Sequence, residues 1–544
     1  MNSVTLWPKH LYLIASGNTP PHHKPSRESM GSKAYNLLRM TDIGLPVPPA
    51  LVIGTHYAKS PEECMLPVFT IGLPALQEAT SRTLGDARKP LIVSVRSGAP
   101  VSMPGMMETL LNIGLCDQTL PGLLRQTGNP RLVWDAYRRL IASYGEVVAG
   151  LSGALFEDEI ARVTQERDER QLDFSELRDL ARRFLSIYQL HAGQPFPQDV
   201  NEQLSGAIRA VFLSWQAEKA QAYRKINQID SAMGTAVTIQ SMVFGNSGGH
   251  SGAGVGFTRN PTTGERQPWV DFLANAQGED VVSGRRNAHG HEALASVAPD
   301  AWRLLQDAAQ TLEQAFLDMQ DFEFTVQDGV LYMLQTRSGK RTPLATARIA
   351  LDLMDEGLID AATALERTKN LHEEELGTVQ LASQGNPDSQ VRPLGQAMSA
   401  CSGVVSGEIT LDGTRAATRA AEGASLVLVR QDAETSDIAA LEFAAGLLTQ
   451  RGARTSHAAV VARQLGKVCL VGCETLRIDL AARTVRLGDL LLKEGDTITL
   501  DGNEGRIYAG VVAGIFVPDV ALIERLKALR ASQAPTRHHK HGAS

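Results

Sequence analysis

One short segment combines a histidine with residues that start helices. An apolar run, residues 445–448, leads into the turn residue Gly452. Thr455 and Ser456 then directly precede His457. Ser and Thr are favoured N-caps because their hydroxyl oxygens accept hydrogen bonds from unpaired backbone N–H groups. The partial positive charge of a helix N-terminus disfavours an imidazolium and stabilises phosphate, so this histidine is predicted to be a neutral nucleophile that carries a phosphoryl group. The alternative is a histidine that only packs or caps.

A predicted strand carries two carboxylates in alternation with apolar residues. Residues 321–326 read Asp-Phe-Glu-Phe-Thr-Val, and this period of two is that of a half-buried strand. Asp321 and Glu323 are therefore expected to share one face. Paired carboxylates beside phosphate groups suit Mg²⁺, which prefers one or two carboxylates together with phosphate oxygens and water. The alternative is an exposed acidic strand face.

A second strand is predicted over residues 330–337, with Gln335 and Arg337 on one face. It is expected to form a hairpin with the carboxylate strand, joined by a three-residue loop, Gln327-Asp328-Gly329. An odd number of loop residues places Gln335 on the face of the two carboxylates.

A glycine-rich hairpin is predicted upstream of these strands. Residues 245–256 contain six glycines, among them Gly252 and Gly254. Without side chains, their backbone N–H groups are open to approach by phosphate oxygens. The segment differs from a Walker A loop because no Gly-Lys-Ser/Thr follows it.

Several long motifs carry a resemblance to a known family. They are Gly-Ser-Lys-Ala-Tyr-Asn-Leu (31–37), Val-Ser-Val-Arg-Ser-Gly-Ala (93–99), Ser-Met-Pro-Gly-Met-Met (102–107), Met-Val-Phe-Gly-Asn (242–246), Asn-Ala-Gln-Gly-Glu-Asp-Val-Val (275–282), Leu-Gln-Thr-Arg-Ser-Gly-Lys-Arg-Thr (334–342) and the His457 segment (452–463). In this order they resemble the pyruvate, phosphate dikinases, a family related to phosphoenolpyruvate (PEP) synthase. The resemblance implies that ATP is cleaved to AMP, a histidine carries the phosphoryl group, and a third domain passes it to pyruvate. Ala453 and Arg454 stand where the family usually has Gly-Met.

The resemblance also implies roles for particular residues. ATP is expected to be bound by Lys33, Arg96, Gly252, Gly254, Glu279 and Gln335. Catalytic roles are expected for His457, Thr455 and Arg337. Asp321 and Glu323 are expected to bind Mg²⁺. Lys33 lies in a glycine-bounded turn before a helix, and Arg96 ends an apolar strand. The alternative is that each is an ordinary surface cation. Both residue types suit phosphate, because lysine supplies a compact charge and the arginine guanidinium can donate two parallel hydrogen bonds.

The composition is that of a globular enzyme. Of the 544 residues, 43% are hydrophobic and 21% charged, which are ordinary fractions. A net charge of −7 argues against a nucleic-acid or membrane-surface partner, and no apolar run approaches the length of a membrane span. The N-terminus lacks the pattern of a signal peptide. The five cysteines fit neither redox nor zinc spacing, so reduced thiols and a cytoplasmic location are expected.

The expected fold class is α/β and α+β multidomain, with an ATP-grasp nucleotide-binding domain and a swivelling β/β/α phosphohistidine domain. The ATP-grasp domain is expected over residues 1–345, with a helical insertion at about 120–235. The remaining predicted parts are a helical linker at 346–394, the phosphohistidine domain at 395–510, and a C-terminal helix with a polar, His-rich tail at 511–544. In the helical insertion one buried face is predicted for Val133, Tyr137, Leu140, Ile141 and Tyr144.

These observations predict an ATP-dependent histidine autokinase of the dikinase type. A pyruvate-binding barrel needs about 250 residues, more than 511–544 supply, so the barrel is expected on another chain. The expected partners are ATP, inorganic phosphate (or water), and this separate PEP/pyruvate-binding barrel. Two alternatives stay open: a regulatory nucleotide-binding remnant without turnover, and a kinase of a different small acceptor.

Overall fold

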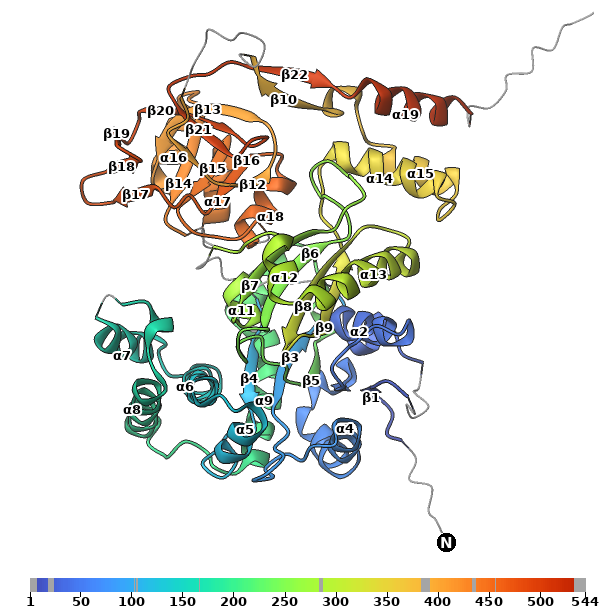
Figure 1. Ribbon diagram of the computed structural model, residues 1–544. Helices are drawn as coiled ribbons and strands as arrows, with labels where there is room; N and C mark the ends of the chain where they lie inside the picture. Colours follow the sequence, from blue (N-terminus) through green and yellow to red (C-terminus); the bar gives the residue numbers. More distant parts are fainter. Residues whose placement is uncertain are drawn as a thin grey trace, which may run out of the picture. The chain divides into compact units, whose positions relative to one another are not determined.

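The computed structural model describes residues 7–17, 24–101, 103, 106–165, 167–282, 287–382, 392–432, 437–454 and 456–532 (Figure 1). The chain divides into two compact units. Unit 1 comprises residues 1–251 and 325–336, and unit 2 comprises residues 252–324 and 337–544. Both units combine helices with sheets, so the predicted multidomain α/β and α+β class is confirmed. Within the described ranges, no helix has the length and apolar character needed to span a bilayer.

Unit 1 is built on a sheet with the strand order β1-β2-β5-β3-β4. Its strands are β1 (Leu11–Ile14), β2 (Ala50–Ile53), β3 (Val93–Gly98), β4 (Thr109–Ile113) and β5 (Ala236–Ser241). Neighbouring strands run antiparallel. Arg96 lies inside β3, which continues two residues beyond the strand end expected from the sequence.

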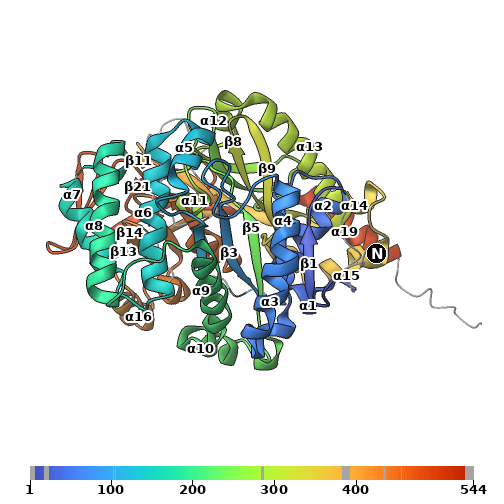
Figure 2. The ribbon, with the colours of Figure 1, turned by 90° about the horizontal axis from the view of Figure 1, so that it is seen from below.

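Helices surround this sheet. They are α1 (Arg27–Met30), α2 (Ser32–Asp42), α3 (Met65–Pro67), α4 (Leu73–Thr80), α5 (Leu120–Thr127), α6 (Pro130–Val147), α7 (Ala154–Thr164), α8 (Phe174–Ala192), α9 (Val200–Leu213) and α10 (Glu218–Ile226). The side chain of Asn129 caps α6 and Pro130 opens it, because proline needs no N–H bond in the first turn. The α6 residues predicted to form one face, Val133, Tyr137, Leu140, Ile141 and Tyr144, are all buried. α6 and α8 pack side by side (Figures 1 and 2).

The first sheet of unit 2 has the strand order β7-β6-β8-β9. Its strands are β6 (Gly252–Phe257), β7 (Trp269–Ala274), β8 (Gln320–Gln327) and β9 (Val330–Ser338); β8 ends in unit 1, and β9 begins in unit 1 and ends in unit 2. Its helices are α11 (Gly278–Val282), α12 (His291–Val297) and α13 (Pro299–Phe316). Arg259, which follows β6 and is fully buried, pairs with Glu313 of α13 at 2.6 Å.

A second sheet of unit 2 has the order β11-β21-β20-β13-β14-β15-β16-β12. Its strands are β11 (Gly395–Gln396), β12 (Met398–Cys401), β13 (Val404–Thr410), β14 (Leu426–Arg430), β15 (Gly446–Thr449), β16 (Val468–Val471), β20 (Thr497–Asp501) and β21 (Arg506–Ala509). Strands β13 to β16 are parallel, so their connections cross over through α16 (Gly413–Ala421), α17 (Ile438–Phe443) and α18 (His457–Gln464). A small sheet, β17 (Leu476–Asp479), β18 (Thr484–Leu487) and β19 (Leu490–Lys493), follows.

The segments on either side of this second sheet pack on each other. α14 (Pro343–Asp355) and α15 (Ala361–Thr368) share a hydrophobic cluster with α19 (Val520–Ser532). β10 (Gly377–Leu381) pairs antiparallel with β22 (Gly514–Pro518). The predicted linker therefore contacts the C-terminal helix as well as joining two sheets. All five cysteines are buried and free, as expected for reduced thiols. The His-rich tail lies outside the described residues.

Candidate active site

The first turn of α2 lies against the end of β3 in unit 1. Gly31, at the start of α2, has φ 77° and no space for a side chain, because a Cβ would lie 1.9 Å from the carbonyl oxygen of Gly98. This close approach brings the turn that carries Lys33 beside the strand that carries Arg96. Lys33 is exposed and Arg96 is half-buried. The fold thus gathers the two predicted phosphate-binding cations on neighbouring segments.

Asn36, one helical turn after Lys33, connects α2 to a third predicted segment. Its Nδ2 donates to the carbonyl oxygen of Thr336 at 2.7 Å, next to Gln335 of β9. Asn36 is only 7% exposed, and its Oδ1 makes no hydrogen bond to any described residue. Sequence reasoning missed this residue, although its spacing from Lys33 puts both on one helix face.

Gly252 and Gly254 lie in β6, and their backbones pair with β7. A Cβ on Gly252 would lie 2.2 Å from Cζ of Phe272, and one on Gly254 would lie 2.3 Å from Cζ of Phe324. These glycines therefore make room for aromatic rings of the neighbouring strands. Space beside the backbone exists earlier in the glycine-rich segment: at Gly249, no atom lies within 4 Å of a Cβ position.

The two predicted metal ligands lie on β8 in unit 2. Asp321 is 3% exposed, and its Oδ2 lies 2.8 Å from Nε of Arg337. Burial raises the pKa of the Asp321 carboxyl above its usual value, although the charge of Arg337 opposes this rise. Glu323 is half-buried. The structure thus brings Asp321 and Arg337, two of the predicted site residues, into direct contact.

The turn between β8 and β9 differs from the prediction. It has two residues, Asp328 (φ 50°) and Gly329 (φ 83°), so the three-residue loop was wrong. Two positive φ values are typical of a type I′ hairpin turn. Counting outward from such a turn places Met319 opposite Ser338, yet the N–H of Gly339 donates to the carbonyl oxygen of Met319 at 3.0 Å. This hydrogen bond, just beyond the ends of both strands, is displaced by one residue from that count.

His457 is the first residue of α18, as predicted from the N-cap pattern. The cap is Ser456, whose Oγ accepts from the N–H of Ala459 at 3.4 Å. Ser456 is 4% exposed, so the cap is protected from water. Thr455, which was predicted to be catalytic, lies outside the described residues. The helix therefore starts at the residue expected to carry phosphate.

The segment that precedes His457 is bonded to β7. Nε of Arg454 lies 2.7 Å from Oδ1 of the fully buried Asp271. Nη2 of Arg454 donates to the carbonyl oxygen of Val270 at 2.8 Å, and its guanidinium lies 4.1 Å from the ring centroid of Trp269. Ala453 is buried in a cluster with residues of β6 and β7. The two residues that depart from the family pattern thus both contact this sheet.

A second arginine makes a similar contact from inside α18. Arg463 is 1% exposed, and its guanidinium lies 5.1 Å from the ring centroid of Trp269 and 5.3 Å from that of Phe257. Its Nε and Nη2 donate to the carbonyl oxygen of Ala400 in β12. The helix that begins with His457 is therefore held both to its own sheet and to the β7-β6-β8-β9 sheet.

The donors on β8 fit a magnesium ion bound together with a nucleotide. Asp321 and Glu323 alternate along the strand, and Mg²⁺ usually takes one or two carboxylates and completes its shell with phosphate oxygens and water. In the described part of the chain no group of three or more His, Cys, Asp or Glu side chains is arranged to hold a metal alone. A two-carboxylate site that needs phosphate oxygens agrees with this. Glu279, predicted to bind ATP, is exposed on α11.

Two segments of the chain match known protein families. Residues 74–293 match the family described as "Pyruvate phosphate dikinase, AMP/ATP-binding domain". Residues 423–505, which include His457, match "PEP-utilising enzyme, mobile domain". The chain is thus similar to an AMP/ATP-binding domain in one segment and to a mobile domain of PEP-utilising enzymes in another.

Individual relatives cover both domains. The chain is 40% identical over 517 residues to the chloroplastic pyruvate, phosphate dikinase of Flaveria pringlei, across 93% of this chain and 54% of the relative. It is 40% identical over 516 residues to that of Clostridium symbiosum, across 92% of this chain and 58% of the relative. The chain is 39% identical over 533 residues to pyruvate, phosphate dikinase 2 of Zea mays, across 94% of this chain and 60% of the relative. The chain is therefore similar to these pyruvate, phosphate dikinases, as its motifs predicted, and spans between 54% and 60% of their length.

Proposed function

We propose that this chain is a dikinase-type phosphotransferase that uses ATP to phosphorylate its own His457 and releases AMP. The observation that supports this most directly is the attachment of the His457 segment, through Arg454 and Arg463, to the sheet that carries Asp321. His457 lies in the matched mobile domain, whereas Asp321 and Glu323 follow the matched AMP/ATP-binding segment, and all three residues belong to unit 2. The matched AMP/ATP-binding domain supports ATP as the substrate.

In the proposed reaction an imidazole nitrogen of His457 attacks the β-phosphorus of ATP. A bond forms between this nitrogen and phosphorus while the bond from phosphorus to the α,β-bridging oxygen breaks, so AMP leaves. The positive end of α18 keeps the imidazole neutral before attack and stabilises the anionic product afterwards. The terminal phosphate then passes to inorganic phosphate, or to water.

The remaining predicted site residues position and neutralise the triphosphate. Lys33, Arg96 and Arg337 supply positive charge, which is the main requirement of phosphoryl transfer. The other proposed nucleotide-binding groups are Gly252, Gly254, Glu279 and Gln335, and Thr455 is proposed to act beside His457. Asp321 and Glu323 would hold Mg²⁺, which when bound neutralises charge on phosphate oxygens.

The final acceptor in this proposal is pyruvate. We propose that it is bound by a PEP/pyruvate-binding barrel that is not among these 544 residues, and that the reaction takes place in the cytoplasm. The support is that the matched families are an AMP/ATP-binding and a mobile domain, and that this chain spans only 54% to 60% of the length of the relatives. Mixing the purified chain with a PEP/pyruvate-binding barrel should yield PEP from pyruvate and ATP, and activity should fall on dilution of the pair.

The first step is tested with ATP labelled at the β-phosphate. With Mg²⁺, the full chain should acquire an acid-labile, base-stable label in proportion to the AMP released. His457→Ala should acquire none, whereas His191→Ala, which changes an exposed histidine of α8, should label at the wild-type rate. Undiminished labelling of His457→Ala would exclude His457 as the carrier. Tight ATP binding without any label would favour the regulatory remnant instead.

A further inference from the structure

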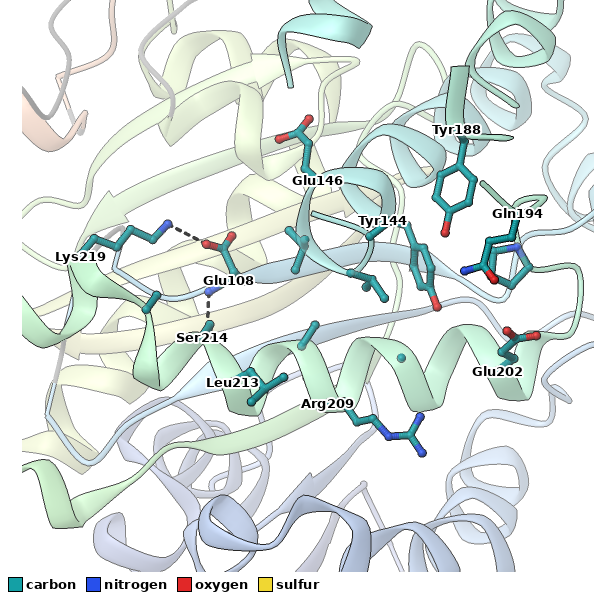
Figure 3. A pocket seen from close by; sticks show the side chains of 17 residues that line it. Glu108, Tyr144, Glu146, Tyr188, Gln194, Glu202, Arg209, Leu213, Ser214 and Lys219 are labelled. Atoms are coloured by element: carbon teal, nitrogen blue, oxygen red, sulfur yellow. Dashed lines mark hydrogen bonds and ion pairs between the residues drawn. The ribbon is translucent and has the colours of Figure 1, made fainter. Parts of the chain in front are cut away.

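A cavity of about 750 Å³ opens in unit 1 among α6, α8 and α9 (Figure 3). Its volume is in the range of small-molecule sites. None of the residues assigned above to ATP, Mg²⁺ or the phosphoryl group lines it. The cavity therefore requires an explanation separate from the proposed kinase reaction.

Two buried tyrosines line this cavity. Tyr144 is 2% exposed and Tyr188 is 1% exposed, and neither hydroxyl makes a hydrogen bond to a described residue. Figure 3 shows both hydroxyls directed toward the side of the cavity where Gln194 and Glu202 lie. Burial raises the pKa of Tyr144 and of Tyr188, with the charge of Glu202 adding to both shifts, so both hydroxyls stay protonated at neutral pH. Neither hydroxyl oxygen is among the fully buried polar atoms that lack a partner, so both are accessible from the cavity, where a ligand can contact them.

The position of the Tyr144 hydroxyl depends on a glycine. A Cβ on Gly206 of α9 would lie 2.3 Å from the hydroxyl oxygen of Tyr144. Glycine is unfavourable inside a helix compared with alanine. The chain nevertheless has glycine at the helix position that leaves this hydroxyl in the cavity.

The charges around the cavity favour a cation. Glu146 and Glu202 line it without an ion-pair partner among the described residues. The positive groups are already engaged, since Nζ of Lys219 lies 2.7 Å from Oε1 of Glu108, and Arg209 pairs with a glutamate outside the cavity. Burial raises the pKa of the Glu146 carboxyl, and the charge of Glu108 contributes, as expected for an excess of negative charge.

We propose that this cavity binds an aliphatic amine with two or more ammonium groups, such as a diamine or polyamine. The two unpaired carboxylates provide separate sites for ammonium groups, and the tyrosine oxygens accept their remaining N–H bonds. Tyrosine faces attract cations, and the lining residues Val147, Val148 and Leu213 are suited to methylene groups. The proposal does not depend on the phosphotransferase function.

Calorimetric titration of the full chain with putrescine and with spermidine, at constant ionic strength, tests this inference. Both should bind saturably at one site per chain, and spermidine should bind more tightly than butylamine, which has one ammonium group. Glu202→Gln and Tyr188→Phe should each weaken the binding of spermidine about tenfold or more, because each removes a hydrogen bond to a charged group. Glu78→Gln, which changes an exposed glutamate on α4, should bind like the wild type.

The side chain of Glu202 is exposed, so Glu202→Gln should keep the wild-type circular dichroism and melting temperature even where Tyr188→Phe does not. Gly206→Ala should weaken spermidine as well, since it displaces the Tyr144 hydroxyl. Absence of saturable binding, equal affinity for butylamine, or equal weakening by Glu202→Gln and Glu78→Gln would each overturn the assignment.

Discussion

Arg454 Nε and Asp271 Oδ1 lie 2.7 Å apart, and Asp271 has no exposed surface. Arg454 lies three residues before His457, whereas Asp271 lies on β7, in the β7-β6-β8-β9 sheet. A buried carboxylate is costly unless a cation compensates it. Trp269 adds a cation–π contact to the same guanidinium. This pair therefore helps to fix where α18 begins relative to the sheet.

Replacing this arginine should slow the proposed phosphorylation of His457. We expect Arg454→Met, which restores the residue usual in the family, to label with ATP about tenfold more slowly, since a hydrogen bond between charged groups is worth about 1.5–3 kcal/mol. Single-turnover labelling measures the rate. Arg451→Met is the matched control, because Arg451 is exposed and its nearest acidic oxygen, on Asp432, is 3.8 Å away.

A double-mutant cycle with Asp271→Asn separates this pair from the other contacts of each residue. The double variant should lose less than the sum of the two single losses, because both changes remove one interaction. Fully additive losses, or an Arg454→Met variant that labels at the Arg451→Met rate, would show that the pair does not position the histidine.

The glycines of β6 give a prediction about stability. Gly254→Ala should lower the free energy of unfolding by about 1–3 kcal/mol, because its Cβ would lie 2.3 Å from Cζ of Phe324 and 2.7 Å from the carbonyl oxygen of Asp271. Gly249→Ala should leave stability almost unchanged, since nothing lies within 4 Å of its Cβ position. Urea denaturation compares the two. Equal losses would contradict the packing explanation.

Local patterns predicted those parts of the site that depend on neighbouring residues. Ser456 caps α18 and His457 begins it, as the N-cap chemistry required. Asp321 alternates with buried phenylalanines on β8, as the period of two required. In both cases the information lies within a few residues of the feature.

Features that join distant residues were not predictable in this way. Arg454 and Asp271 are 183 positions apart, and the sequence showed only that Arg454 departs from the family pattern. The phenylalanine rings over Gly252 and Gly254 come from other strands, so the sequence did not show that these glycines make room for rings.

Removing one proposed metal ligand should abolish histidine labelling while the fold is kept. Glu323→Gln keeps the shape of a half-buried side chain but removes its charge, and metal ions contribute several kcal/mol to charge stabilisation in the transition state. Labelling should therefore fall by at least about a hundredfold at any Mg²⁺ concentration. Glu265→Gln, an exposed control, should label normally. A Glu323→Gln variant that labels at the wild-type rate would place the metal elsewhere.

A buried ion pair in α6 predicts acid sensitivity of the helical part of unit 1. Asp135 is 4% exposed, with Oδ1 2.6 Å from Nη2 of Arg138 and Oδ2 3.0 Å from Nε of Arg139. Burial alone would raise the pKa of Asp135, but Arg139 and Arg138 outweigh burial and hold this pKa below its usual value. Arg138 is also 4% exposed, so loss of Asp135 leaves its buried charge with only the partly exposed Glu169 as an acidic partner. Asp135→Asn should therefore cost about 3–5 kcal/mol at pH 7.

The sign of the pH dependence follows from this lowered pKa. The unfolded chain binds a proton at Asp135 near pH 4, about the reference value, while the folded chain does so only at lower pH. The contribution of Asp135 to the free energy of unfolding is therefore complete above about pH 4. It is lost as the pH falls from there through the lower pKa of the folded chain. Urea denaturation between pH 7 and pH 3 should show the gap between the wild type and Asp135→Asn narrowing below about pH 4. Asp179→Asn, an exposed α8 control, should differ little from the wild type throughout. A gap that stays constant down to pH 3 would mean that Asp135 stabilises the helix through packing rather than through its charge.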